Sequence, residues 1–152
     1  MSEIIDKFNK QFEQFLIEIK KNYPEFTADI DTLYIFPNNN SNYIEQFYEN
    51  CIDNVQFISE QNEIIFSESN TIISGINFNK IWNDEKIDTE FKNIIWKYIY
   101  TLYIFSFEYI QKKDLTTIIK EINNDGDEPV SDDYKMFMTI ITKFKEEFIN
   151  IS

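Results

Sequence analysis

Apolar residues recur at helical spacing over three long stretches of the chain. The first covers residues 2–22, where an apolar stripe lies opposite lysines and glutamates, and Pro24 ends the pattern. The second covers 42–58 and is the clearest amphipathic pattern in the sequence, and the third covers 131–148. Each stretch opens with a residue that can cap a helix. These patterns predict three amphipathic helices.

Shorter patterns predict further helical segments between them. Residues 27–36 resemble a short helix, although their alternation of apolar and polar residues also fits an extended segment. Single helical turns are expected at 59–66 and 78–83, and a short helix is expected at 114–122. Polar, Asn-rich or acidic loops connect these segments.

The segment 89–111 differs from the others because apolar residues occupy nearly its whole circumference. A helix that is apolar on every side must be surrounded by other elements. With only two glycines in the chain, the sequence predicts an all-α, single-domain helical bundle over residues 1–152 around this central helix. The alternative is an α+β fold with a small hairpin in 55–80.

Charge narrows the chemistry that the chain can perform. The net charge is −13, and all 14 basic residues are lysines because arginine and histidine are absent. Without histidine there is no Ser-His or Cys-His dyad and no imidazole ligand for a metal. Without arginine there is no bidentate clamp for phosphate or for guanine. We therefore predict no direct binding of nucleic acid, no catalytic residue, no cofactor-binding residue and no metal ligand.

The acidic segment 123–133 is the one candidate for a cation site in the sequence. Alignment of Gly126 with the glycine of a calcium-binding loop puts Glu128 where an apolar residue is expected. The same alignment puts Asp132 where a bidentate glutamate is needed. The poor match favours a solvated connection that leads into the last helix.

The position of the chain in the cell can be predicted from three features. Cys51 is the only cysteine and lies within a helical pattern, which favours a packed thiol in a reducing compartment. The first residues are acidic and carry no secretory signal. The most apolar stretch, 98–107, is too short to span a bilayer. We expect an intracellular, cytoplasmic protein without a membrane span.

Aromatic residues are unusually frequent, at 17% of the chain. A stacking platform for nucleic acid needs a basic groove, which this composition cannot supply, so most aromatic side chains are expected in the core. A surplus could line a surface for a partner. The candidate partner-binding residues are Tyr43, Phe47, Tyr48, Trp82 and Trp96.

The order of several segments resembles an uncharacterised protein family of large nucleocytoplasmic DNA viruses. The segments that carry the resemblance are 15–25, 62–66, 75–83 and 95–102. The resemblance implies a viral, intracellular origin, in the host cytoplasm or the virion, and a common unit over residues 12–106. That family has no assigned activity, so the resemblance transfers no catalytic or binding residue.

A looser similarity, of fold alone, is to viral apoptosis regulators, which hold a partner helix in a groove around a hydrophobic central helix. The segment Gly75-Ile76-Asn77-Phe78-Asn79-Lys80 is similar to the Asn-Trp-Gly-Arg segment of that family, with Asn79 and Lys80 in place of its glycine and arginine. The arginine that pairs with the ligand would be missing.

Three functional hypotheses follow from the sequence. The first is a non-enzymatic, acidic interaction module that binds a basic or helical protein partner or associates with itself. The second is a mimic of nucleic acid, or an escort, that occupies a basic DNA-binding protein. The third is an enzyme restricted to carboxylate, lysine or tyrosine chemistry. The missing motifs favour the first.

Overall fold

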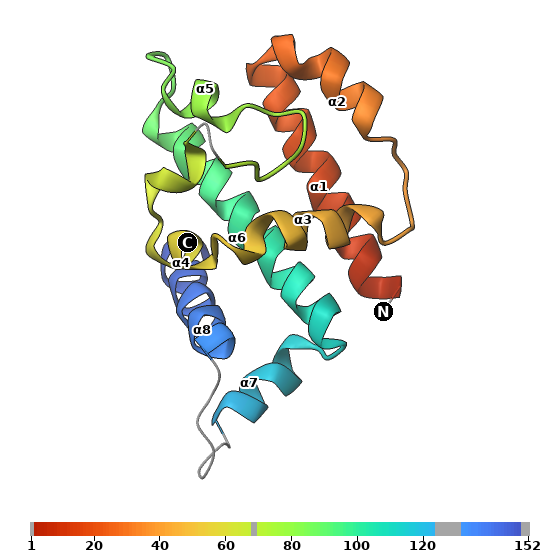
Figure 1. The fold of residues 1–152 in the computed structure, drawn as a ribbon, viewed down its shortest axis with the longest axis vertical. Helices are drawn as coiled ribbons and strands as arrows, with labels where there is room; N and C mark the ends of the chain where they lie inside the picture. The colour runs from red at the N-terminus through yellow and green to blue at the C-terminus, as the bar shows by residue number, and fades with distance from the viewer. Residues whose placement is uncertain (1, 68–69, 124–131, 150–152) are drawn as a thin grey trace.

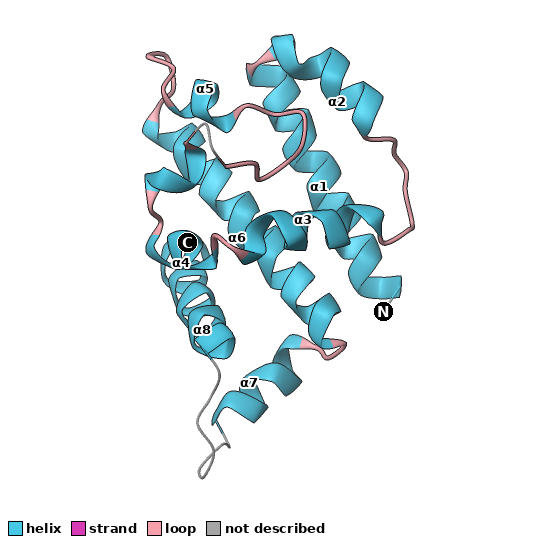
Figure 2. Cartoon of the chain, viewed as in Figure 1, coloured by secondary structure: helices cyan, strands magenta, loops and turns pink. Residues whose placement is uncertain are grey.

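The computed structural model describes residues 2–67, 70–123 and 132–149, which form helices joined by loops and contain no strand (Figures 1 and 2). The predicted all-α fold class is confirmed. The helical elements in chain order are α1 (Ser2–Asn22), η1 (Pro24–Phe26), α2 (Thr27–Leu33), α3 (Asn42–Ile52), α4 (Val55–Glu60), η2 (Glu63–Phe66), α5 (Phe78–Trp82), α6 (Thr89–Gln111), α7 (Leu115–Asn123), α8 (Asp132–Phe144) and η3 (Lys145–Ile149).

The central helix is α6, which begins and ends at the residues that the sequence predicts. The Asp88 side chain caps it by accepting a hydrogen bond from the Phe91 backbone N–H at 2.8 Å. At its other end Lys112 adopts a left-handed conformation with φ of 56°. Helices α1, α3, α7 and α8 all contact α6, and α3 crosses in front of α1 and α6 in Figure 1. The helix is therefore surrounded, as its apolar circumference predicts.

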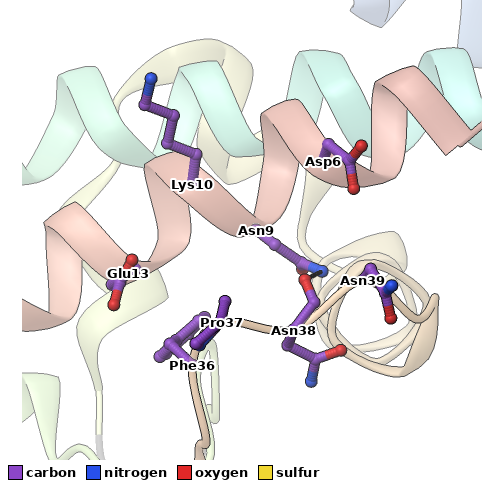
Figure 3. Close-up of a pocket in the computed structure, with 8 residues that line it drawn as sticks. All are labelled: Asp6, Asn9, Lys10, Glu13, Phe36, Pro37, Asn38 and Asn39. Carbon is purple, nitrogen blue, oxygen red and sulfur yellow. Dashed lines mark hydrogen bonds between the residues drawn. The ribbon is translucent and has the colours of Figure 1, made fainter.

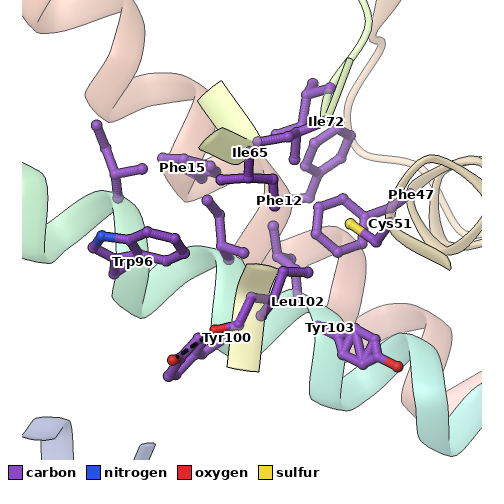
Figure 4. Close-up of a cluster of buried hydrophobic side chains, with 14 of the residues drawn as sticks. Phe12, Phe15, Phe47, Cys51, Ile65, Ile72, Trp96, Tyr100, Leu102 and Tyr103 are labelled. Atoms are coloured by element: carbon purple, nitrogen blue, oxygen red, sulfur yellow. Dashed lines mark hydrogen bonds between the residues drawn. The ribbon is translucent and has the colours of Figure 1, made fainter. Parts of the chain in front are cut away.

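The core is one cluster of buried side chains from several helices. Figure 4 shows residues of α1, α3 and α6 together with Ile65 and Ile72 in this cluster. The Tyr100 hydroxyl, which is buried on α6, donates a hydrogen bond to the Ile58 carbonyl on α4 at 2.8 Å. Aromatic side chains thus fill the core and also link its helices by hydrogen bonds.

The predicted helix over 42–58 is wrong at its centre, because it is two helices. Helix α3 ends at Ile52 and α4 begins at Val55. Between them the Asn54 N–H donates to the Cys51 carbonyl at 2.8 Å, and the Asn54 side chain donates to the Asn50 carbonyl at 3.3 Å. Asparagine side chains compete with the helical hydrogen-bond pattern in this way.

The other boundaries differ less from the prediction. Helix α2 ends at Leu33, and the chain is extended at Tyr34, so the predicted helix over 27–36 is three residues shorter in the structure. The last helix passes from α8 into the π-helical turn η3. The alternative hairpin in 55–80 is wrong, because the described part of that segment holds α4, η2 and α5.

Candidate interaction surface

The five predicted partner-binding residues lie in two groups. Tyr43, Phe47 and Tyr48 lie on α3, whereas Trp82 lies on α5 and Trp96 on α6. Phe47, Trp82 and Trp96 are buried, and the other two are half-buried. Helix α3 therefore carries the candidate positions that a partner could reach from solvent.

The two tryptophans meet inside the molecule. Their rings are 6.0 Å apart, and Phe66 stacks on Trp82 at 4.3 Å. The Trp82 indole N–H donates to the Glu63 carboxylate at 2.9 Å, and Lys92 lies over the indole with its Nζ 4.8 Å from the ring centroid. The Trp82 indole thus has a hydrogen-bond partner, two aromatic neighbours and a lysine over its ring, all within the fold, which is typical of a core tryptophan.

Tyr43 belongs to a second aromatic group. Its ring contacts Phe12, Tyr34 and Phe36 with centroid distances of 5.6, 5.2 and 5.6 Å. Its hydroxyl accepts a hydrogen bond from the Ile35 N–H at 2.9 Å. Tyr43 thereby attaches the extended segment after α2 to the start of α3.

Tyr48 lies at the edge of α3 that faces α6. Its ring stacks on Tyr103 at 6.3 Å, and burial together with the charge of Asp133 raises the pKa of its hydroxyl. One turn further along α3, Ile52 is 48% exposed. Tyr48 and Ile52 together form a small apolar edge beside the solvent-facing side of the helix.

The solvent-facing side of α3 carries a row of carboxylates. Glu45 and Glu49 lie on α3, and Asp53 is the residue that directly follows its last residue, Ile52. The three are spaced four residues apart, and all are exposed. Residues four apart lie on the same face of a helix. No lysine occurs between Lys21 and Lys80 in the sequence, and none of the ion pairs found among the described residues includes these three. We call Glu45, Glu49 and Asp53 the acidic row.

Hydrogen bonds hold one end of the acidic row in place. The Glu45 carboxylate accepts from the Ser41 hydroxyl and from the Tyr109 hydroxyl, each at 3.2 Å. The second bond links α3 to α6. Sequence reasoning singled out the aromatic residues of α3 and missed this row, although the spacing of four residues is visible in the sequence.

A pocket of about 410 Å³ lies next to the start of α3, between α1 and residues 36–39 (Figure 3). Asp6, Asn9 and Glu13 of α1 line it, and Phe36 and Pro37 form its apolar part. No sequence motif marks this pocket. The available signal is Asn9 itself, an amide among the apolar residues of α1.

Asn9 is 3% exposed and crosses from α1 to the loop. Its Nδ2 donates to the carbonyls of Asn38 at 2.7 Å and Asn40 at 3.2 Å. Its Oδ1 is buried and has no hydrogen-bond partner within the described residues. A buried acceptor without a donor is unusual in a folded protein.

Other candidate chemistry falls in the core or outside the described ranges. Cys51 is buried, and burial strongly raises the pKa of its thiol, as expected for a packed cysteine. Within residues 2–67, 70–123 and 132–149, no group of three or more Asp, Glu, Cys or His side chains is placed to hold a metal ion. Most of the acidic segment 123–133 lies outside the described residues, so its prediction is untested.

The segment that resembles apoptosis regulators leads into α5. Gly75 has φ of 89°, a conformation that favours glycine, and Asn77 caps α5 by accepting from the Lys80 N–H. The Lys80 ammonium lies 3.4 Å from the Glu25 carboxylate. Lys80 therefore has a partner within the chain.

Comparisons of the chain with known protein families, with curated proteins and with solved structures found no match. The resemblance to proteins of large DNA viruses therefore stays a prediction from the sequence. None of the helices in the described part of the chain has the length and apolar character needed to span a bilayer.

Proposed function

We propose that this chain is a non-enzymatic, acidic interaction module that binds a basic protein partner through the outer face of α3. The observation that carries the proposal is the acidic row, three exposed carboxylates at intervals of one helical turn without a lysine beside them in the sequence. Charged surfaces of this kind attract and orient partners of opposite charge.

The acidic row lowers the stability of α3, because its carboxylates repel one another. A basic partner would relieve this repulsion, which supports a role in binding. Like charges four residues apart destabilise a helix by about 0.2–0.5 kcal/mol per pair. Glu45 and Glu49 form such a pair within α3, and Glu49 forms a second with Asp53 at the C-cap. Tyr48 and exposed Ile52 lie along one edge of the row. They would add apolar contact to the charge–charge attraction, a combination that is common in protein interfaces.

A protein partner fits the row better than mimicry of DNA does. Four residues of helix rise about 6 Å, whereas a DNA strand carries one phosphate about every 3.4 Å of axis. The row therefore has about half the linear charge density of one strand. Self-association through the same face is also disfavoured, because a two-fold contact would place the row against its own copy.

A pull-down with the tagged chain tests the proposal. The wild-type chain and a Glu45→Gln, Glu49→Gln, Asp53→Asn variant are incubated with an extract of the native cells, washed at low and then at high salt, and the retained proteins are identified by mass spectrometry. We expect a defined basic protein that the wild type retains and the variant loses. Equal retention by the two chains would contradict the proposal.

A further inference from the structure

The pocket between α1 and residues 36–39 has the chemistry of a site for a cationic side chain. Its ionisable lining residues are Asp6, Glu13 and Lys10. In Figure 3 the Lys10 side chain extends from α1 on the side away from Asn38 and Asn39. The groups that face the loop are therefore two carboxylates and an amide.

Asn9 supplies the observation that points to a ligand. Both of its buried N–H bonds go to loop carbonyls, which fixes the orientation of the amide, and Oδ1 is left as an acceptor without a donor. Asp6 precedes Asn9 by three residues and Glu13 follows it by four, so the three side chains share one face of α1. On the α1 side the pocket thus offers three acceptors, while the donor groups among its lining residues belong to Lys10, Asn38 and Asn39.

The apolar part of the pocket selects the kind of donor. Phe36 and Pro37 line the side opposite α1, and the volume of about 410 Å³ lies within the usual range for small-ligand sites. An arginine side chain combines an apolar stem with a planar group that carries five N–H donors and stacks on aromatic rings. Pro37 offers a surface for such a stem, and Phe36 offers a ring for the guanidinium beside the acceptors of α1.

We propose that this pocket binds an arginine side chain of the basic partner, with Asn9 Oδ1, Asp6 and Glu13 as acceptors. The inference rests on the proposed function, since it adds an anchor point for the same partner. Residues 36–39 lead through Asn40 and Ser41 into α3. One basic protein segment could therefore reach both the pocket and the acidic row.

The test uses a single amino-acid probe so that it does not depend on the acidic row. The ¹⁵N-labelled full chain is titrated with N-acetyl-arginine-methylamide, and with N-acetyl-citrulline-methylamide as a neutral probe of nearly the same shape. Binding is followed through the side-chain amide signals of Asn9 and the backbone amides of residues 36, 38 and 39. We expect saturable shifts with the arginine probe and none with the citrulline probe.

Two variants locate the binding. Asp6→Asn with Glu13→Gln removes the two carboxylate charges of the pocket and leaves Asn9 intact. We expect about fivefold weaker binding of the arginine probe, since charge pairs open to solvent contribute only modestly. Glu49→Gln with Asp53→Asn alters the acidic row, and we expect unchanged binding of the same probe.

The outcomes separate the pocket from the proposed function. The arginine site would be overturned if the amide signals of the wild type did not shift, or if the citrulline probe shifted them equally. It would also be overturned if the pocket variant bound the arginine probe as tightly as the wild type does. If the arginine probe binds as expected while the pull-down retains no basic protein, the site stands and the proposed function fails. A lysine probe that binds more tightly than arginine would also overturn the assignment.

Discussion

Tyr100 and Tyr98 lie two residues apart on α6 and differ in what their hydroxyls do. Tyr100 is fully buried and donates to the Ile58 carbonyl on α4. Tyr98 is half-buried and stacks on Phe15 at 4.8 Å, and its hydroxyl has no hydrogen-bond partner within the described residues. The two residues form a matched pair for measuring what the hydroxyl contributes to stability.

Tyr100→Phe is expected to lower the free energy of unfolding by about 1 kcal/mol. The loss stays modest because the Ile58 carbonyl keeps a second bond from the Gln61 N–H at 3.2 Å. Tyr98→Phe should change the stability by less than about 0.5 kcal/mol. Urea unfolding of the three proteins measures both values. Equal losses for the two substitutions would refute the role assigned to the Tyr100 hydroxyl.

Glu108 is a buried carboxylate on α6 that accepts a hydrogen bond from the backbone N–H of Leu115, the first residue of α7. Burial raises the pKa of Glu108 above its ordinary value of 4.5, and the Leu115 bond and the charge of Lys7 lower it by less. The folded protein therefore binds this proton more tightly than the unfolded chain does. The contribution of Glu108 to stability is greatest below the unfolded pKa and is lost as pH rises through the folded pKa.

The Glu108→Gln variant tests the direction of this pH dependence. The amide oxygen can still accept from Leu115, and it carries no charge to desolvate. The stability of the variant relative to the wild type is expected to increase as the pH rises from below 4.5 towards neutrality, as measured by urea unfolding at several pH values. A difference that does not change with pH would show that the Glu108 pKa is unperturbed.

At the scale of the element, α3 combines a buried face with an outer face whose charges repel one another. Ile44, Phe47 and Cys51 point into the core, and the acidic row occupies the opposite side. The buried face holds the helix in place against the repulsion of the row. Replacing a carboxylate of the row by a neutral or positively charged side chain should therefore stabilise the protein.

Glu49→Lys is expected to raise the free energy of unfolding by roughly 1 kcal/mol, because it replaces two like-charge pairs, with Glu45 and Asp53, by two opposite-charge pairs. Glu49→Gln removes the repulsion alone and should give a smaller gain. Thermal unfolding at low salt compares the stabilities of the two variants with that of the wild type. If the lysine variant were no more stable than the glutamine variant, the charges of the row would not interact.

Helical periodicity predicted the long elements well. The bounds of α1 and α6 follow from an apolar pattern together with Pro24, which stops the first helix, and Asp88, which caps the start of α6. The break between α3 and α4 was not predicted, because the apolar pattern continues across Asp53 and Asn54. It depends on hydrogen bonds from Asn54 that periodicity does not contain.

The candidate surface was predicted only in part. Helix α3 was expected to carry partner-binding residues, but Phe47 is buried in the structure, as are Trp82 and Trp96. Aromatic residues suit a core and an interface equally well, so composition cannot separate the two. The pocket beside Asn9 joins residues about thirty positions apart, and only the fold brings them together.

At the scale of the whole molecule, the charge is unevenly distributed along the chain. The net charge is −13, and the lysines fall into two sets on either side of the segment between Lys21 and Lys80. That segment includes α2, α3 and α4. Lys20 and Lys80 pair with Asp31 and Glu25 of this segment, whereas none of the ion pairs among the described residues includes the acidic row. A basic partner would be attracted by the net charge and oriented by the row.

The central claim is that the acidic row, and not the overall charge, directs binding. It is tested most directly by calorimetric titration of the full chain with an amphipathic, arginine- and lysine-rich helical peptide at several salt concentrations. The row variant Glu45→Gln, Glu49→Gln, Asp53→Asn is compared with a control of equal charge, Glu85→Gln, Glu90→Gln, Glu146→Gln, whose three side chains are exposed on separate segments.

Binding of the wild type should weaken as salt increases, because salt screens exposed charges. The account predicts that the control binds the peptide nearly as well as the wild type, and that the row variant binds it at least about tenfold more weakly at low salt. Equal weakening in the two variants would mean that net charge alone governs binding, and it would contradict the assignment of α3 as the interaction surface.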